Sequence, residues 1–368
     1  MPGLTMRPSL KGPDVSSSAP IFVAALGATT PVGRDAWSSA AAVRAGISGF
    51  AEHPFMVDTV GQPMRAALAP WLDIDLMGVG RLEALLLPAI DQVLAPVLEE
   101  HPGALRMALS LGLPSPRPGL ADDVRQQITK SVQQRYPKIF SAVATFPNGH
   151  AAGLLALDAA VKKVAEGAFD ACVVAGVDSY IEPTTLEWLE ANDQLHGAGP
   201  LNNAWGFIPG EGAGALLIAR REVAERLRLD PLARVLGVGT GFEANRIKTQ
   251  TVCIGEGLTQ AFRGALAGLP DDFRITDVYC DLNGEPYRAD EYGFTALRTK
   301  EAFESASDFV APADCWGDVA AASAPLHLVL AAIAGAKGYA NGNVAFAWAS
   351  AEGGERGAVL MATTRGSA

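Results

Sequence analysis

Side chains able to do covalent or metal chemistry are few in this chain. Its 368 residues include five histidines and four cysteines, Cys172, Cys253, Cys280 and Cys315. The cysteines form no Cys-x-x-Cys pair, so neither a disulfide framework nor a thiolate zinc site is predicted. No His, Asp and Glu spacing typical of a metal site occurs, and no Gly-Lys-Ser/Thr follows a glycine-rich loop. We therefore predict no metal and no cofactor.

Charge and hydropathy argue against two further classes of protein. Lys and Arg number 29 against 40 Asp and Glu, a formal net charge of -11, and no basic run could neutralise a phosphate backbone. We predict no nucleic-acid partner. The longest apolar stretch, residues 319–336, contains Ser323, Pro325 and His327, so it predicts a buried helix and no membrane span. Scattered cysteines fit a reducing compartment, and we predict a cytoplasmic protein.

Short apolar runs alternate with longer helical patterns from residue 21 onward, as is typical of an α/β fold with buried strands. We predict that Asp35 is the N-cap of a helix that ends near residue 45. Residues 1–20 contain four prolines and three consecutive serines, which predicts a flexible N-terminal tail. The runs that we predict as strands are 21–28, 171–175, 213–219, 233–239, 277–282, 344–349 and 358–363.

Two stretches of the chain share one pattern. Gly149 and His150 open a helix of small residues over 151–166, a glycine ends it, and the predicted strand 171–175 follows. Gly317 and Asp318 open the helix 319–336, which another glycine ends before the strand 344–349. The pattern suggests a duplicated α/β unit with halves at 21–228 and 229–368. Any α/β protein repeats helix–strand units, so the repeat alone leaves duplication open.

The most specific pattern is Gly-Phe-Ile-Pro-Gly-Glu-Gly-Ala-Gly at 206–214. It resembles the Gly-Phe-x-x-Gly-Glu-Gly-Ala-Gly segment of the β-ketoacyl synthases, members of the thiolase superfamily, and segments at 23–33, 45–49 and 166–179 agree in the same order. The resemblance implies an α/β thiolase-like fold, a duplicated αβαβα five-layer architecture. We predict a structural loop at Gly206, Gly210, Glu211 and Gly212, whose backbone turns tightly in conformations that side chains would forbid.

The resemblance also implies where the catalytic Cys-His-His residues of the family would lie, and all three differ here. The nucleophilic cysteine, at the start of a buried helix, corresponds to His150. The two histidines correspond to Asn283, in Asn-Gly-Glu-Pro-Tyr, and to Asp318. None of the four cysteines falls at the helix start, and the nearest, Cys315, lies three residues before Asp318. We therefore predict that no acyl thioester forms.

The last motif of the family, Gly-Phe-Gly-Gly, carries an aromatic gate and an oxyanion-hole amide. It corresponds to Ala-Glu-Gly-Gly at 351–354. The resemblance thus assigns Glu352, Gly353 and Gly354 to substrate-binding positions, with a carboxylate in place of the aromatic gate.

Two functions remain open at this stage. The first is a non-condensing protein that resembles the chain-length-factor subunits, which pair with an active ketosynthase and lack its cysteine. The second is a divergent acyltransferase or thioester or ester hydrolase, in which His150 acts as a base with Asp318, since a helix N-terminus favours neutral imidazole. The family implies a homodimer, or a heterodimer with an intact ketosynthase, through a strand at 141–145. It also admits an acyl carrier protein as a partner, although the acidic balance counts against that docking.

Overall fold

All seven predicted strands are present, in a computed structural model that describes residues 19–99, 105–267 and 274–364. The predicted tail, apart from residues 19 and 20, lies outside the described residues. In chain order the first elements are β1 (Ile21–Thr29), α1 (Ala36–Arg44), β2 (Phe50–Val57), β3 (Pro63–Ala67), α2 (Gly78–Glu99), β4 (Met107–Gly112), α3 (Val124–Arg135), β5 (Phe140–Phe146), α4 (Ala152–Ala165), β6 (Ala171–Ser179), α5 (Pro183–Ala191), β7 (Glu211–Arg220) and α6 (Arg221–Arg226). There follow β8 (Ala233–Phe242), α7 (Glu256–Leu266), β9 (Asp277–Cys280), α8 (Pro286–Thr299), α9 (Ala313–Trp316), α10 (Ser323–Ala336), β10 (Val344–Ser350) and β11 (Glu355–Thr363).

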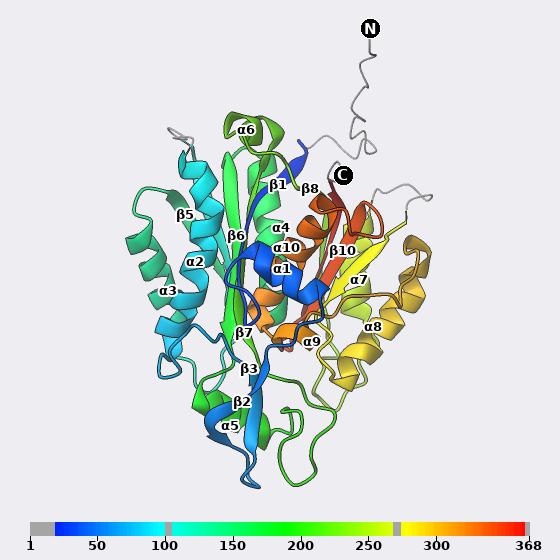
Figure 1. The fold of residues 1–368 in the computed structure, drawn as a ribbon. Coiled ribbons are helices and arrows are strands. Elements are labelled where there is room, and N and C mark those ends of the chain that lie inside the picture. Colours follow the sequence, from blue (N-terminus) through cyan, green and yellow to red (C-terminus); the bar gives the residue numbers. More distant parts are fainter. Residues whose placement is uncertain (1–18, 100–104, 268–273, 365–368) are drawn as a thin grey trace.

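The strands form two groups joined at one seam. The order is β5-β4-β6-β7-β1-β8-β11-β10-β9, and β1 meets β8 through only three residue pairs. Helix α2 covers β1, β6 and β7 on one outer side, and α7 covers β8 and β11 on the other. Helices α4 and α10 lie between the two groups and contact both (Figure 1). This is the predicted five-layer αβαβα architecture, and that prediction is confirmed.

The two groups repeat the same order of elements. The first group contains, in chain order, β1, α2, β4, α3, β5, α4, β6 and β7. The second group contains the corresponding elements in the same order: β8, α7, β9, α8, a single bridge in place of a strand, α10, β10 and β11. The bridge is the parallel contact of Val310 with Tyr279, which takes the place of a full strand equivalent to β5. The residue limits of the two halves stay a prediction.

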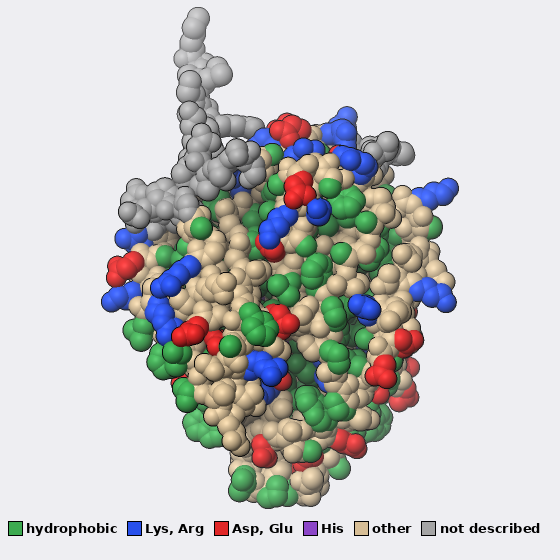
Figure 2. Space-filling view, turned by 180° about the vertical axis from the view of Figure 1, so that it is seen from behind, with side chains coloured by type: hydrophobic (Ala, Val, Ile, Leu, Met, Phe, Trp, Pro, Cys, Tyr) green, Lys and Arg blue, Asp and Glu red, His purple; other side chains and the backbone are tan. Residues whose placement is uncertain are grey.

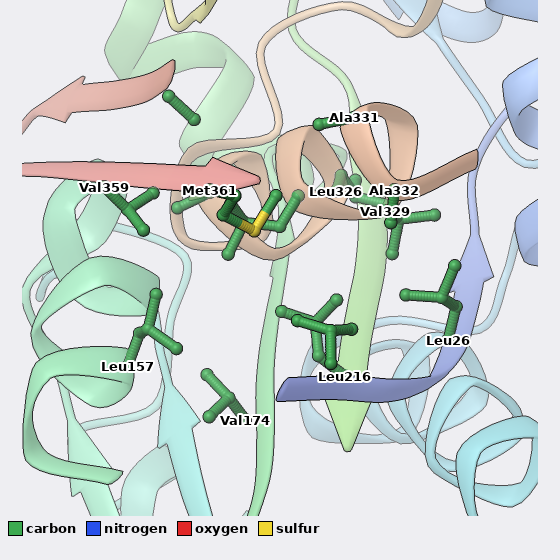
Figure 3. Packing of buried hydrophobic residues seen from close by; sticks show 14 of the residues in the cluster. Leu26, Leu157, Val174, Leu216, Leu326, Val329, Ala331, Ala332, Val359 and Met361 are labelled. Atoms are coloured by element: carbon green, nitrogen blue, oxygen red, sulfur yellow. The ribbon is translucent and has the colours of Figure 1, made fainter. Parts of the chain in front are cut away.

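Helix α10 is apolar on every side because both strand groups cover it. Every residue from Ser323 to Gly335 is buried, as the predicted buried helix requires, although its first turn (Ala320–Ala322) is a 3-10 helix. Figure 3 shows Leu326 of α10 in one core with Leu157 of α4, Leu216 of β7 and Met361 of β11. The residues that open α4 and α10 are thereby fixed in the middle of the molecule.

The glycines of the 206–214 segment serve close packing, and our prediction that they adopt side-chain-forbidden conformations is wrong. None of Gly206, Gly210, Gly212 and Gly214 has a left-handed φ. A Cβ at Gly210 would lie 2.2 Å from the carbonyl oxygen of Trp316, and the Gly210 N–H donates to the carbonyl of Asp318 at 2.9 Å. The motif therefore lets β7 approach the segment that carries Asp318.

Several helices and strands were not predicted from the sequence, among them α2 and β4. Helix α2 contains Pro88 and Pro96, which normally interrupt helices, yet it packs a buried apolar face that includes Leu85 and Leu86 against the sheet. Strand β4 is a run of Met, Ala, Leu, Ser and Gly without β-branched residues, so it lacks the usual strand composition. The predicted cap of α1 is present, since Asp35 accepts from the N–H groups of Trp37 and Ser38 at 2.9 Å. Within the described residues, no helix is both long and apolar enough to cross a membrane.

Candidate functional site

The start of the α4 segment holds His150 between the two strand groups. Strand β5 ends at Phe146, and a 3-10 turn over Gly149–Ala151 leads into α4. Gly149 has a φ of +55°, a left-handed value that favours glycine, and a Cβ there would lie 2.7 Å from the Ser115 hydroxyl oxygen. The turn sets the His150 side chain inside the protein, 4% exposed.

Three residues predicted for the site lie in direct contact. His150 Nε2 lies 2.9 Å from both carboxylate oxygens of Asp318. The Asn283 amide donates to the same carboxylate at 2.6 Å, and the Ala320 N–H donates to it at 2.8 Å. The segments around residues 150, 283 and 318 thus meet at one carboxylate.

A buried arginine, which the sequence analysis did not identify, completes this cluster. The guanidinium of Arg288, fully buried on α8, lies 3.1 Å from His150 Nε2 and 3.4 Å from Nδ1. Burial alone would raise the pKa of Asp318, but His150 and Arg288 hold it below its usual range. Ionised Asp318 can only accept, so Nε2 carries a hydrogen toward it, and the Arg288 guanidinium lies within hydrogen-bond distance of Nδ1. Both ring nitrogens are therefore engaged by protein groups.

Further carboxylates surround Arg288. Its guanidinium donates to Asp281 at 2.9 Å and to the carbonyl of Ser350 at 2.8 Å, and it lies 3.5 Å from Glu285. Burial raises the pKa of Asp281 despite the nearby guanidinium. The interior next to His150 thus holds more carboxyl groups than cations.

Glu352 belongs to a second group of charges at the edge of the site. Lys248, on the loop after β8, donates to Glu352 at 2.5 Å and to Gln194 at 2.7 Å, and it forms an ion pair with Glu285 at 3.1 Å. Burial alone would raise the pKa of Glu352, and the Lys248 ammonium outweighs it, so that pKa is lowered. Gly353 and Gly354 form the tight turn between β10 and β11, where the Gly354 N–H donates to Ala351 at 3.2 Å.

The cavity at His150 is small. It measures about 60 Å³ and is lined by His150, Glu352, Gln194 and Arg117, among others. Arg117 is held by an ion pair with Asp178 at 2.5 Å. A larger, open cavity of about 300 Å³ lies on the other side of Asn283, with Arg65, His196 and Asp314 among its lining residues and without His150. Pockets for small molecules measure roughly 300–1,000 Å³, so the cavity at His150 is well below that size.

One group of side chains in the described residues has the proximity of metal ligands, although no sequence spacing predicted it. A ligand atom from each of Glu243, Cys253 and Glu291 lies within 4.8 Å of the others. Glu291 forms a buried ion pair with Arg356 at 2.6 Å, and burial together with Glu291 raises the pKa of the Cys253 thiol to about 11. These contacts make the group part of an ion-pair network.

Comparison with known protein families identifies one stretch of the chain that matches a family pattern. The family pattern described as the β-ketoacyl synthase N-terminal domain matches residues 145–224, the stretch from β5 through β7 that includes His150. This stretch of the chain is therefore similar to the N-terminal domain of β-ketoacyl synthases. No curated protein sequence matches this ketosynthase-like chain.

Solved structures resemble the ketosynthase-like chain over nearly its whole length. One chain in the structure of a type II polyketide synthase acyl-carrier protein in complex with its ketosynthase gives a TM-score of 0.77 at 14% identity, over 95% of this chain and 100% of that one. The ishigamide ketosynthase/chain length factor gives 0.76 at 18%, over 94% and 100%. The ketosynthase from module 6 of the bacillaene synthase of Bacillus subtilis 168 gives 0.74 at 14%, over 94% and 72%. These likenesses establish the fold.

Proposed function

We propose that this ketosynthase-like chain is a non-condensing subunit in acyl or polyketide-type biosynthesis, comparable to a chain length factor. The observation that carries the proposal is the imidazole in the place of the nucleophile. Its two nitrogens are engaged by Asp318 and Arg288, so no lone pair is free to attack a thioester or to accept a proton from a substrate. The likeness to the ishigamide ketosynthase/chain length factor supports the same class.

The surroundings of His150 support the proposal as well. Decarboxylative condensation needs a site that tolerates the carboxylate of an extender unit, and here Asp281, Asp318, Glu285 and Glu352 outnumber the cations Arg288 and Lys248. The small cavity leaves no room for an acyl chain.

The first prediction is the absence of condensing activity. Purified protein incubated with acyl and malonyl thioesters is expected to yield no β-ketoacyl product and no acyl adduct by intact-mass spectrometry, because no thiol lies at the helix start. An intact ketosynthase assayed in parallel supplies the positive control. An adduct of acyl mass on any residue would contradict the proposal.

A second candidate function rests on the 2.9 Å contact of His150 with Asp318, which resembles a base held by its orienting carboxylate. In that case the chain would hydrolyse thioesters or esters. His150→Ala and Asp318→Asn would each cost roughly a hundred-fold or more in rate, and the two losses would not multiply. Our proposal expects no turnover in the parent protein, so turnover that both variants abolish would favour the hydrolase.

We also propose that the chain pairs through β5, with a second copy or with an intact ketosynthase. In the nine-stranded sheet β5 is an edge strand, bonded to β4 on one side only. Unpaired edges invite strand addition, and this edge leads directly into His150. An acyl carrier protein serving the partner ketosynthase would then meet this subunit too.

The second prediction tests the β5 edge. Ala144 is exposed on β5, so Ala144→Glu leaves the monomer core untouched and sets like charges close together across a symmetric strand pair. Light scattering is expected to give about twice the 38.3 kDa chain mass for the parent alone, or a mixed dimer with a ketosynthase, and the monomer mass for the variant. Gln133→Glu on the exposed side of α3 is the charge-matched control. If the parent protein stays monomeric both alone and with a ketosynthase, pairing through the β5 edge is ruled out.

We place this function in the cytoplasm, with support from four cysteines that are all unpaired thiols. On the face seen in Figure 2, Lys and Arg side chains of the described residues are interspersed with acidic ones, so this face has no continuous basic patch of the kind that binds nucleic acid.

A further inference from the structure

The strongest feature outside the His150 cluster is the environment of the Lys248 ammonium. The ammonium donates hydrogen bonds to Gln194 at 2.7 Å and to Glu352 at 2.5 Å, and it forms an ion pair with Glu285 at 3.1 Å. Two aromatic rings complete the enclosure, Phe207 at 5.6 Å and Tyr287 at 5.5 Å from the nitrogen. We name these five side chains the ammonium cage.

The walls of the cage do not belong to the loop that fills it. Lys248 lies on residues 243–255, between β8 and α7, whereas the walls come from the segment after α5, the start of α8 and the β10–β11 turn. Glu285 is held independently of Lys248, because its other oxygen accepts from Asn283 at 2.9 Å and from the Tyr287 hydroxyl. Glu285 therefore keeps these two hydrogen bonds whether or not Lys248 contacts it.

The loop itself is held in the cage by few contacts. Lys248 has a φ of +56°, a left-handed value that is unfavourable for a residue with a side chain. Its neighbours Thr249, Gln250 and Thr251 are exposed. The Lys248 side chain is 18% exposed, and Ile247 next to it is buried, at 3% exposure. Withdrawal of these two side chains would release the middle of the loop.

An empty cage would be electrostatically unfavourable. Without Lys248, Glu285 at 5% side-chain exposure and Glu352 at 38% would lose the ammonium that both contact, and Glu285 would keep its 3.5 Å ion pair with Arg288. Gln194 and Glu352 also line the 60 Å³ cavity that reaches His150. A ligand that replaces the lysine would thus bring its own cation and would place its remaining atoms in that cavity.

We propose that the ammonium cage is a binding site for a short, unbranched primary alkylamine, which Lys248 occupies while the 243–255 loop is closed. The two hydrogen-bond acceptors, Gln194 and Glu352, select a primary ammonium over a quaternary one, because each accepts from an N–H donor, and Glu285 and the aromatic faces favour the cation. The volume of the adjoining cavity limits the ligand to a few carbon atoms. The proposed binding site does not depend on whether the protein has condensing activity.

The test uses Lys248→Ala, which removes three carbons and the nitrogen, and n-propylammonium, which restores them. The melting temperature of the variant is expected to rise on titration with n-propylammonium and to stay unchanged with n-propanol, which lacks the charge, or with tetramethylammonium, which lacks the N–H donors. Lys248→Met is the matched variant: it also lacks the charge, but its side chain fills the space, so no rise is expected. Adding Glu285→Gln to Lys248→Ala should weaken binding at least about tenfold.

The parent protein decides whether the site is native. At about 1,000 times the dissociation constant measured for Lys248→Ala, n-propylammonium is expected to displace Lys248 and to increase amide hydrogen exchange over residues 243–255. Failure of Lys248→Ala to bind, equal binding of n-propanol, or an unchanged parent under these conditions would each overturn the proposal. If Lys248→Ala does not fold, the exchange measurement on the parent alone decides.

Discussion

Replacing Glu211 with leucine is expected to lower the free energy of unfolding by about 3–5 kcal/mol, because the change leaves a buried guanidinium unpaired. Glu211 opens β7 and is fully buried. Arg81 of α2 reaches it through two hydrogen bonds of 2.6 and 2.7 Å, and the Ser179 hydroxyl and the Ala69 N–H donate to it at 2.9 and 2.7 Å. One carboxylate thus joins α2, the end of β6 and the segment before α2.

Chemical denaturation with circular dichroism measures the loss. The double variant Arg81→Met with Glu211→Leu is expected to recover part of it, since no charge is then stranded. Arg135→Met breaks the exposed pair with Asp91 and is expected to cost no more than about 1 kcal/mol. A Glu211→Leu protein within about 1 kcal/mol of the parent would show that the buried pair is not a determinant of stability.

The 206–214 segment illustrates how far a pattern can be interpreted. Its resemblance to ketosynthases correctly predicted the fold, yet the physical reason given for its glycines was wrong. Backbone strain is a local property, whereas the contact that Gly210 permits is with Trp316, more than a hundred residues away. Likewise, nothing in the sequence around Glu211 predicts its ion pair with Arg81. Partners brought together by tertiary packing leave no local signal.

The strands were predictable where the chain is buried on both faces. The runs at β1, β6, β7 and β10 are almost continuously apolar because helices cover both sides of the sheet. Helix α2 could not be predicted in this way, because Pro88 and Pro96 lie within it and prolines normally interrupt helices. The helix tolerates them because its apolar face is buried against the sheet, and that burial is not visible in the local sequence.

The site was accessible only in part. His150, Asn283 and Asp318 could be located because each follows a recognisable segment, and the structure brings them into contact. Arg288 was missed although it stands three residues after Glu285, the spacing of an ion pair on a helix. Lys248 had no signal at all, because its loop has neither periodicity nor a motif.

The other large effect is expected at Arg288. Arg288→Met should lower the free energy of unfolding by about 3–5 kcal/mol, because it removes the cation from a fully buried cluster of carboxyl groups. Asp281 at 2.9 Å would lose its partner, and the carbonyl of Ser350 would lose a donor at 2.8 Å. The Nδ1 atom of His150 would also lose the donor that engages it.

Two companion variants separate charge from shape. Arg288→Lys keeps a cation but lacks the planar fork that reaches Asp281 and His150 together, so we expect an intermediate loss of about 2 kcal/mol. Adding Asp281→Asn to Arg288→Met should restore stability relative to the single variant, because the stranded carboxylate is then gone. If Arg288→Met unfolds at the same denaturant concentration as the parent, the guanidinium does not hold the cluster together. The explanation for an inert His150 would then fail with it, since that explanation requires Arg288 to occupy Nδ1.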